Sequence, residues 1–173
     1  PPTVPILGDL IGECSYILNT RPTTTDNCAG TITGTTGDYP IPYTFDKIGT
    51  YEIEWQFDDG NGNISKVTQN VVIGNDTAPI PRNLPTDNLD PISFDMNGWP
   101  IYAALETITG GCEVTNVPTP TATDFCGNIF SGVSNVAFPI TDFGETTITW
   151  TYTDGNGNIS KQEQIIDVTA DTV

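Results

Sequence analysis

The chain has 173 residues, with 5 Lys and Arg against 22 Asp and Glu, no histidine and a formal net charge of −17. Such an acidic surface repels phosphate backbones and anionic lipids, which excludes nucleic acids and membrane surfaces as partners. No run approaches the ~18 apolar residues of a membrane span, and Ser-His and Cys-His couples need a histidine. We therefore expect neither membrane insertion nor an enzyme.

The first predicted unit covers residues 1–76 and consists of short alternating stretches between turns. The clearest is Tyr51–Phe57, in which every second residue is aromatic or aliphatic and the others are polar. That period of two is typical of a half-buried strand. A turn rich in Gly and Asn follows, and then a second alternating run to Ile73, which together predict a β-hairpin. About seven such strands predict an antiparallel sandwich.

One stretch of this hairpin occurs twice, as Asp-Gly-Asn-Gly-Asn-Ile-Ser-Lys at Asp59–Lys66 and again at Asp154–Lys161. Each copy follows an alternating run that contains a tryptophan, Trp55 or Trp150. The duplication predicts an all-β fold of two tandem antiparallel Ig-like β-sandwiches, residues 1–76 and 77–173. A short linker with Pro79 and Pro81 joins them, and proline stiffens a linker.

The second unit holds extra residues near 87–103, which predict an inserted hairpin turning on Asn97 and Gly98. Trp99 and Tyr102 lie in it. One interpretation is a ligand-contacting protrusion in which these two rings form a sugar platform. The other is an added edge hairpin whose Trp99 packs on the sandwich, with Pro100 protecting the edge.

The four cysteines form two pairs of identical spacing, Cys14 with Cys28 and Cys112 with Cys126. One pair in each repeat predicts two disulfides, Cys14–Cys28 and Cys112–Cys126, and an oxidising, extracellular location. Two free buried pairs are the alternative. A four-cysteine zinc site is excluded because close Cys-x-x-Cys couples are absent.

Oxygen-bearing residues concentrate in the repeated turn, and calcium takes six to eight oxygen ligands. In an Ig-like sandwich this turn lies at the pole where the chain enters. We therefore expect a structural calcium ion at the junction of the units, held by Asp76, Asp124, Asp154, Asn156 and Asn158. The matching set in the first unit is Asp26, Asp59, Asn61 and Asn63. The alternative is turn chemistry alone, in which Asp and Asn side chains bond local backbone.

Two elements recur in order in both units, Thr-Asp-x-Cys and then Trp-x-x-x-Asp-Gly-Asn-Gly-Asn-Ile-Ser, and Asp-Thr-Ala-Pro follows in the linker. This pattern resembles the hyalin-type (HYR-like) repeat, and it is most similar to the tandem Ig-like repeats of giant SprB-like gliding-motility adhesins of Bacteroidetes. The resemblance implies a surface-displayed array for adhesion and gliding, without catalysis.

Two functions remain open from the sequence. The first is a structural spacer of an exported bacterial surface adhesin, a monomeric segment whose partners are neighbouring repeats of the same chain and a surface polysaccharide. The second is a carbohydrate-binding module of a secreted protein. An acidic pair could also hydrolyse a glycoside, but acids that repeat in both units fit architecture better than one active site.

Overall fold

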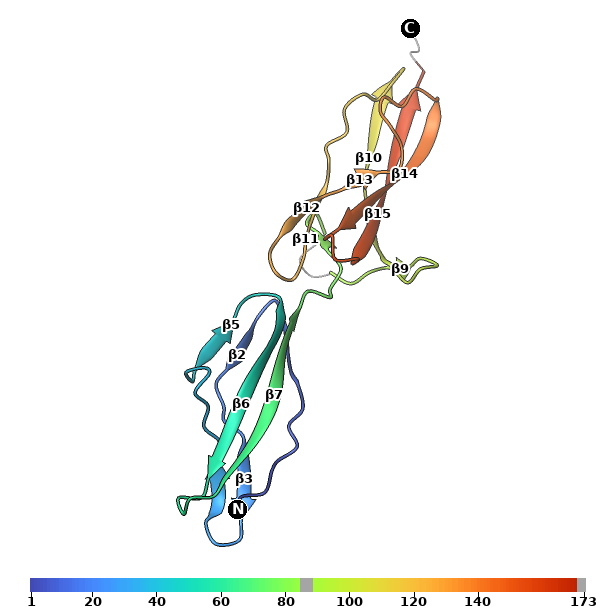
Figure 1. The fold of residues 1–173 in the computed structure, drawn as a ribbon. Coiled ribbons are helices and arrows are strands. Elements are labelled where there is room, and N and C mark those ends of the chain that lie inside the picture. Colours follow the sequence, from blue (N-terminus) through green and yellow to red (C-terminus); the bar gives the residue numbers. More distant parts are fainter. Residues whose placement is uncertain (85–88, 171–173) are drawn as a thin grey trace. The chain divides into compact units, whose positions relative to one another are not determined.

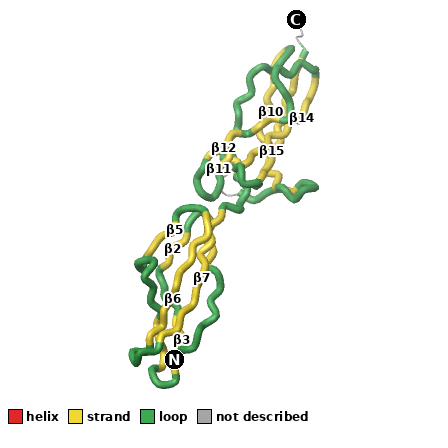
Figure 2. Tube along the Cα trace, viewed as in Figure 1, coloured by secondary structure: helices red, strands yellow, loops and turns green. Residues whose placement is uncertain are grey.

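The computed structural model describes residues 1–84 and 89–170, and it divides the chain into two compact units, Pro1–Asn75 and Asp76–Val173. Strands, turns and loops make up the described residues, none of which is helical (Figure 2). The predicted all-β class is confirmed. No described helix is long and apolar enough to cross a membrane.

Unit 1 contains seven strands in three small sheets (Figure 1). The sheet orders are β1-β7-β6, β2-β5 and β3-β4. The bounds are β1 (Leu10–Glu13), β2 (Tyr16–Leu18), β3 (Thr23–Asp26), β4 (Gly30–Thr33), β5 (Tyr43–Phe45), β6 (Gly49–Asp58) and β7 (Ile64–Gly74).

Unit 2 contains eight described strands, in a five-stranded sheet of order β13-β14-β15-β10-β9 and a three-stranded sheet of order β12-β11-β8. The bounds are β8 (Ile80–Pro81), β9 (Ser93–Phe94), β10 (Pro100–Gly111), β11 (Thr121–Thr123), β12 (Ile129–Ser131), β13 (Val133–Ser134), β14 (Gly144–Thr153) and β15 (Ile159–Thr169).

The duplicated hairpin is the longest antiparallel pair of each unit, β6 with β7 and β14 with β15. Its alternating residues point inward as predicted, and Ile53, Trp55 and Phe57 are completely buried. The core of unit 2 holds Ile148, Trp150 and Tyr152 at the matching positions.

Both tryptophans are fixed by the same relay of hydrogen bonds. The Trp55 indole N–H donates to Gln69 Oε1 at 3.0 Å, and Gln69 Nε2 donates to the Gly8 carbonyl at 2.7 Å. In unit 2, Trp150 donates to Gln164 at 3.0 Å, and Gln164 donates to the Glu106 carbonyl at 2.9 Å. A buried polar group is tolerated when it is hydrogen-bonded. Each relay ties the core tryptophan to the strand that runs beside the last strand of the unit, at Gly8 just before β1 or at Glu106 within β10.

The sandwiches differ from the prediction in one respect, because they are not purely antiparallel. β1 runs parallel to β7 in unit 1, and β10 runs parallel to β15 in unit 2. Parallel neighbours require a long crossover between them. Here the strands in between form that crossover, β2 to β6 in unit 1 and β11 to β14 in unit 2.

The insertion forms the predicted hairpin within its described part, while Asp87 and Asn88 lie outside the described residues. β9 pairs with the start of β10, and Gly98 in the turn has a φ of 80°. β9 is thereby one of the two edge strands of the five-stranded sheet, with β13 at the other edge. The insertion leads directly into β10, which has 12 residues, whereas its counterpart in unit 1, β1, has 4.

Candidate functional sites at the turns and poles

Each unit has two poles, which the long hairpin defines. In unit 1 the N-terminal pole holds the β6–β7 turn, next to the Asp58↔Ile64 pair, and the C-terminal pole lies beyond the Gly49↔Ile73 pair. In unit 2 the β14–β15 turn marks the N-terminal pole, and the Gly144↔Val168 pair marks the C-terminal pole.

The repeated stretch closes the N-terminal pole of unit 1 through its own side chains. Asp59 Oδ1 accepts the backbone N–H groups of Asn61 at 2.8 Å and Asn63 at 3.1 Å. The Asn63 side-chain amide donates to Asp59 Oδ2 at 2.7 Å. The Ser65 hydroxyl then donates to the Pro2 carbonyl at 2.5 Å, which fastens the start of the chain to β7.

The same bonds recur in unit 2. Asp154 Oδ1 accepts the N–H groups of Asn156 at 2.8 Å and Asn158 at 3.2 Å, and Asn158 Nδ2 donates to Asp154 Oδ2 at 2.6 Å. The Ser160 hydroxyl donates to the Pro79 carbonyl. Asp124, which is 5% exposed, accepts the backbone and side-chain N–H groups of Asn128 at 2.8 and 2.9 Å. Asp154 and Asn158 therefore make the local bonds that turn chemistry predicts.

The sequence-predicted calcium residues of unit 1 do come together. Asp26, Asp59, Asn61 and Asn63 line one cavity of about 370 Å³ at the N-terminal pole, with Pro1, Asn27 and Cys28. Backbone N–H groups of Ala29 and Cys28 lower the pKa of Asp26, and the Asn63 side-chain amide lowers the pKa of Asp59. Both carboxylates are therefore ionised at neutral pH, as calcium ligands must be.

In unit 2 the predicted residues come from three segments of the chain. Asp154, Asn156 and Asn158 belong to the β14–β15 turn, and Asp124 follows β11. Asp76 is exposed at the start of the unit. Among the described residues, no group of three or more His, Cys, Asp or Glu is arranged to hold a metal. The predicted sets each rely on amide oxygens beside their carboxylates, so calcium binding there stays a prediction.

The predicted disulfides Cys14–Cys28 and Cys112–Cys126 are wrong, because Cys28 and Cys112 are free and exposed. Cys14 and Cys126 are the disulfide-bonded cysteines.

The reason is the position of each cysteine in its unit. The Cys14 N–H donates to the Gly74 carbonyl at 2.8 Å at the C-terminal pole, whereas Cys28 lines the cavity at the N-terminal pole. The 11 residues of β7 separate these poles by roughly 30 Å, since a strand rises about 3.3 Å per residue. A disulfide needs Cα atoms within about 7 Å.

The predicted sugar platform is not assembled. Tyr102 is 5% exposed and belongs to the buried residues of unit 2, so it presents no ring face to a ligand. The Lys161 ammonium lies over the Trp99 ring, 4.7 Å from its centroid, and forms a salt bridge of 2.7 Å with Asp95. The large apolar side chains exposed on the hairpin are instead Ile92, Phe94 and Met96, which the sequence analysis did not single out.

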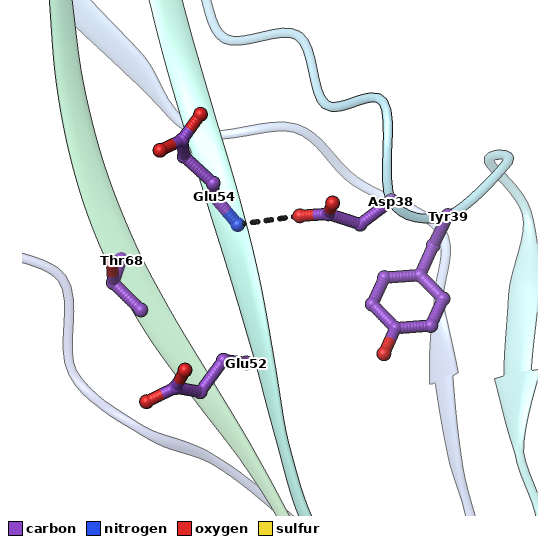
Figure 3. Close-up of a pocket in the computed structure, with 5 residues that line it drawn as sticks. All are labelled: Asp38, Tyr39, Glu52, Glu54 and Thr68. Carbon is purple, nitrogen blue, oxygen red and sulfur yellow. Dashed lines mark hydrogen bonds between the residues drawn. The ribbon is translucent and has the colours of Figure 1, made fainter.

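An acidic cavity that the sequence did not indicate lies beside β6 of unit 1, with a volume of about 490 Å³ (Figure 3). Asp38 and Tyr39 reach it from the loop between β4 and β5, and Glu52, Glu54 and Thr68 from β6 and β7. The Glu54 backbone N–H donates to Asp38 Oδ2 at 2.8 Å. The Glu54 carboxylate is paired with Lys66 at 2.8 Å.

That bond has a counterpart in unit 2, where the Thr149 backbone N–H donates to Asn135 Oδ1 at 2.7 Å. In each unit a loop side chain therefore accepts a hydrogen bond from a backbone N–H of the first strand of the long hairpin. An unpaired strand edge is prone to pair with other chains, so these contacts have an architectural explanation.

Comparison with known proteins gives no family assignment. No family model matches the chain, and no curated protein matches it. Two solved structures are similar in part. A mouse structure, clustered PcdhgC3 EC1-3, has a TM-score of 0.35 and 14% identity over 97% of this chain and 67% of that chain. An endo-fucoidan hydrolase, MfFcnA9 from glycoside hydrolase family 107, has a TM-score of 0.25 and 15% identity over 89% of this chain and 27% of that chain.

Proposed function

We propose that the chain is a pair of structural repeats from an exported bacterial surface adhesin. In this role the units act as a spacer in an array for cell adhesion and gliding motility. Their partners are neighbouring repeats and, at the cell surface, polysaccharide. The sequence resemblance to the SprB-like repeats motivates the adhesin and gliding parts of the proposal.

One observation carries the spacer function: the residues of the repeated stretch make the same internal bonds in both units. Asp59 and Asp154 organise the turn, Asn63 and Asn158 bond back to them, and Ser65 and Ser160 fasten the start of each unit. A scaffold repeat requires the bonds that are present.

The disulfide-bonded Cys14 and Cys126 support an extracellular location, because disulfides persist in oxidising compartments. The acidic surface, with a net charge of −17, supports an exposed, solvated position. Neither feature favours catalysis, and we propose that the chain is not an enzyme.

Segment replacement in the producing bacterium tests the spacer function. One strain carries the adhesin without residues 1–173, and a second carries two unrelated Ig-like domains of similar length in their place. Adhesion and gliding should fall in the first strain and recover in the second, because a spacer contributes length and not specific contacts. Failure of the replacement to restore either activity would show that these residues contribute a specific interaction.

The carbohydrate-binding alternative has weaker support, because Tyr102 is buried and Lys161 covers one face of Trp99. A glycan array with the intact chain and with the Trp99→Ala variant discriminates the two functions. We expect no binding by either protein. Binding that disappears in the variant would favour the module over the spacer.

We also propose that calcium stiffens the N-terminal poles. The gathering of Asp26 and Asp59 with two asparagines around one cavity supports it. The thermal midpoint should rise at about millimolar calcium, the range typical of extracellular modules, relative to chelator at equal ionic strength. Asp59→Asn should reduce the rise. An unchanged midpoint would argue against a structural ion.

A further inference from the structure

The two exposed cysteines occupy positions that the fold repeats. Cys28 follows β3 at the N-terminal pole of unit 1, as Cys126 follows β11 in unit 2. Cys112 follows β10 at the C-terminal pole of unit 2, as Cys14 follows β1 in unit 1. Each repeat therefore carries one cysteine at each pole.

At the C-terminal pole the two repeats share the backbone conformation around the cysteine as well as the cysteine itself. Cys14 and Cys112 are the described non-glycine residues with positive φ, 64° and 62°. Each is the middle residue of a γ-turn, closed by Ser15 N–H to the Glu13 carbonyl and by Glu113 N–H to the Gly111 carbonyl, both at 2.7 Å. Each also donates its own N–H to the last strand, at Gly74 or Thr169.

The two cysteines at equivalent positions of the repeats differ in whether they form a disulfide. Cys14 and Cys126 are disulfide-bonded, whereas Cys112 and Cys28, at the same positions of the other repeat, are free and exposed. A cysteine at one pole cannot reach the other pole of its own unit, since roughly 30 Å separates them and a disulfide needs about 7 Å or less between Cα atoms. A disulfide between the two cysteines of one unit is therefore excluded.

We propose that Cys112 and Cys28 are disulfide sites for further repeats of this kind. The Cys112 thiol bonds to the N-terminal-pole cysteine of one repeat, and the Cys28 thiol bonds to the C-terminal-pole cysteine of another. The pairing is thus always between opposite poles. The inference rests on the proposed array function for the identity of the partner, a repeat of the same type.

The bond forms by thiol–disulfide exchange with a low-molecular-weight disulfide such as oxidised glutathione. One thiolate attacks that disulfide to give a mixed disulfide and releases one small thiol. The thiolate of the opposite-pole cysteine then displaces the second small thiol and forms the Sγ–Sγ bond. The two cysteines lose two electrons and two protons, and the oxidant is reduced to two thiols.

Selective cross-linking of the full chain tests the inference, with a second copy as the probe. Wild-type chain, Cys28→Ser, Cys112→Ser and an equal mixture of the two variants are incubated at high concentration with reduced and oxidised glutathione. Non-reducing gels and intact mass follow the products, peptide mapping identifies the bonds, and circular dichroism checks that both variants fold.

We expect the wild type to form multiples of the 18.6 kDa chain. Each variant alone should remain at the mass of one chain, because it keeps a single free cysteine, at one kind of pole only. The mixture should yield the mass of two chains, joined through Cys28 of one variant and Cys112 of the other.

Two outcomes would overturn the inference. One is a wild-type chain that remains monomeric or carries only glutathione adducts. The other is dimer formation by either variant alone as readily as by the mixture, which would mean unselective reaction of surface thiols. Either outcome leaves segment replacement as an independent test of the spacer function.

Discussion

Two glycines in each repeated turn hold a backbone conformation that other residues rarely adopt. Gly60 and Gly62 have φ values of 75° and 90°, and Gly155 and Gly157 have values of 82° and 102°. None of them has a neighbouring atom that an added Cβ would meet within 4 Å. Backbone conformation, not lack of space, is therefore the reason for glycine at these positions.

Alanine at Gly62 should accordingly destabilise the protein. We expect Gly62→Ala to lower the free energy of unfolding by about 1–2 kcal/mol, the penalty for a Cβ in the left-handed region. Gly37→Ala is the matched control, since Gly37 is exposed, has open space around it and lacks a positive φ. Urea titration measures both. Equal effects of the two substitutions would refute the explanation.

The Asp95 carboxylate gives the inserted hairpin a defined pH dependence. Its hydrogen bond with Lys161, aided by the N–H groups of Trp99 and Asn97, lowers the pKa of Asp95 to about 2. The unfolded value is about 3.9. Because the folded pKa is the lower one, the ionised form stabilises the fold fully above pH about 4, and this contribution disappears as the pH falls toward about 2.

Thermal midpoints of wild type and Asp95→Asn between pH 2 and 5 measure this contribution. We expect the difference between the two proteins to be largest at pH 5 and to shrink toward pH 2. Asp46→Asn, at an exposed position outside the hairpin, serves as the control. Parallel curves for wild type and Asp95→Asn would contradict the assignment.

Single residues also show which features can be predicted from the sequence and which cannot. The repeated turn was recognised because Asp, Asn and Gly carry its conformation locally. The cysteine pairing was missed because equal spacing along the chain gives no information on which pole each cysteine occupies. The burial of Tyr102 was missed because an isolated hairpin sequence does not show which of its faces meets the core.

At the scale of elements, alternation identified the long hairpin β6–β7 and its core residues. It did not reveal that β1 and β10 run parallel to the last strands, because strand direction depends on a crossover through the whole unit. Nor did it reveal the loop contacts at the hairpin edge, Asp38 to the Glu54 N–H and Asn135 to the Thr149 N–H. Those contacts join residues from different elements.

The Trp55–Gln69–Gly8 relay connects three elements, so its loss should weaken unit 1 as a whole. Gln69→Leu leaves the indole N–H and the Gly8 carbonyl without their protein partner. We expect the free energy of unfolding to fall by about 1–3 kcal/mol, because the buried indole N–H is left unsatisfied, whereas Gly8 is exposed and its carbonyl can bond to water. Denaturant unfolding of this variant measures the loss.

The double variant Trp55→Phe/Gln69→Leu provides the control for this relay. Removing both partners of the indole bond should destabilise the protein less than the sum of the two single changes. Strict additivity would mean that the hydrogen bond contributes nothing beyond the packing of its side chains.

At the scale of the whole molecule, 22 acidic residues face 5 basic ones, and like charges repel within the folded units. Sodium chloride should therefore raise the thermal midpoint between about 10 mM and 1 M, as the Debye length falls from about 30 Å to 3 Å. A midpoint that is constant or falls with salt would show that the Asp and Glu side chains are already compensated by local bonds.

The parallel pairing of β1 with β7 and of β10 with β15 has a mechanical consequence. When a unit is pulled by its two ends, β1 and β7, or β10 and β15, are drawn along each other in opposite directions. Their ladder is then loaded in shear, so its hydrogen bonds resist together and do not open one by one. Four residue pairs form this ladder in unit 1 and seven in unit 2. Single-molecule stretching of the chain with its disulfide reduced should show two rupture events, with unit 1 yielding at the lower force. Ile11→Pro, at an exposed position within the β1 ladder, should lower the first event and leave the second unchanged.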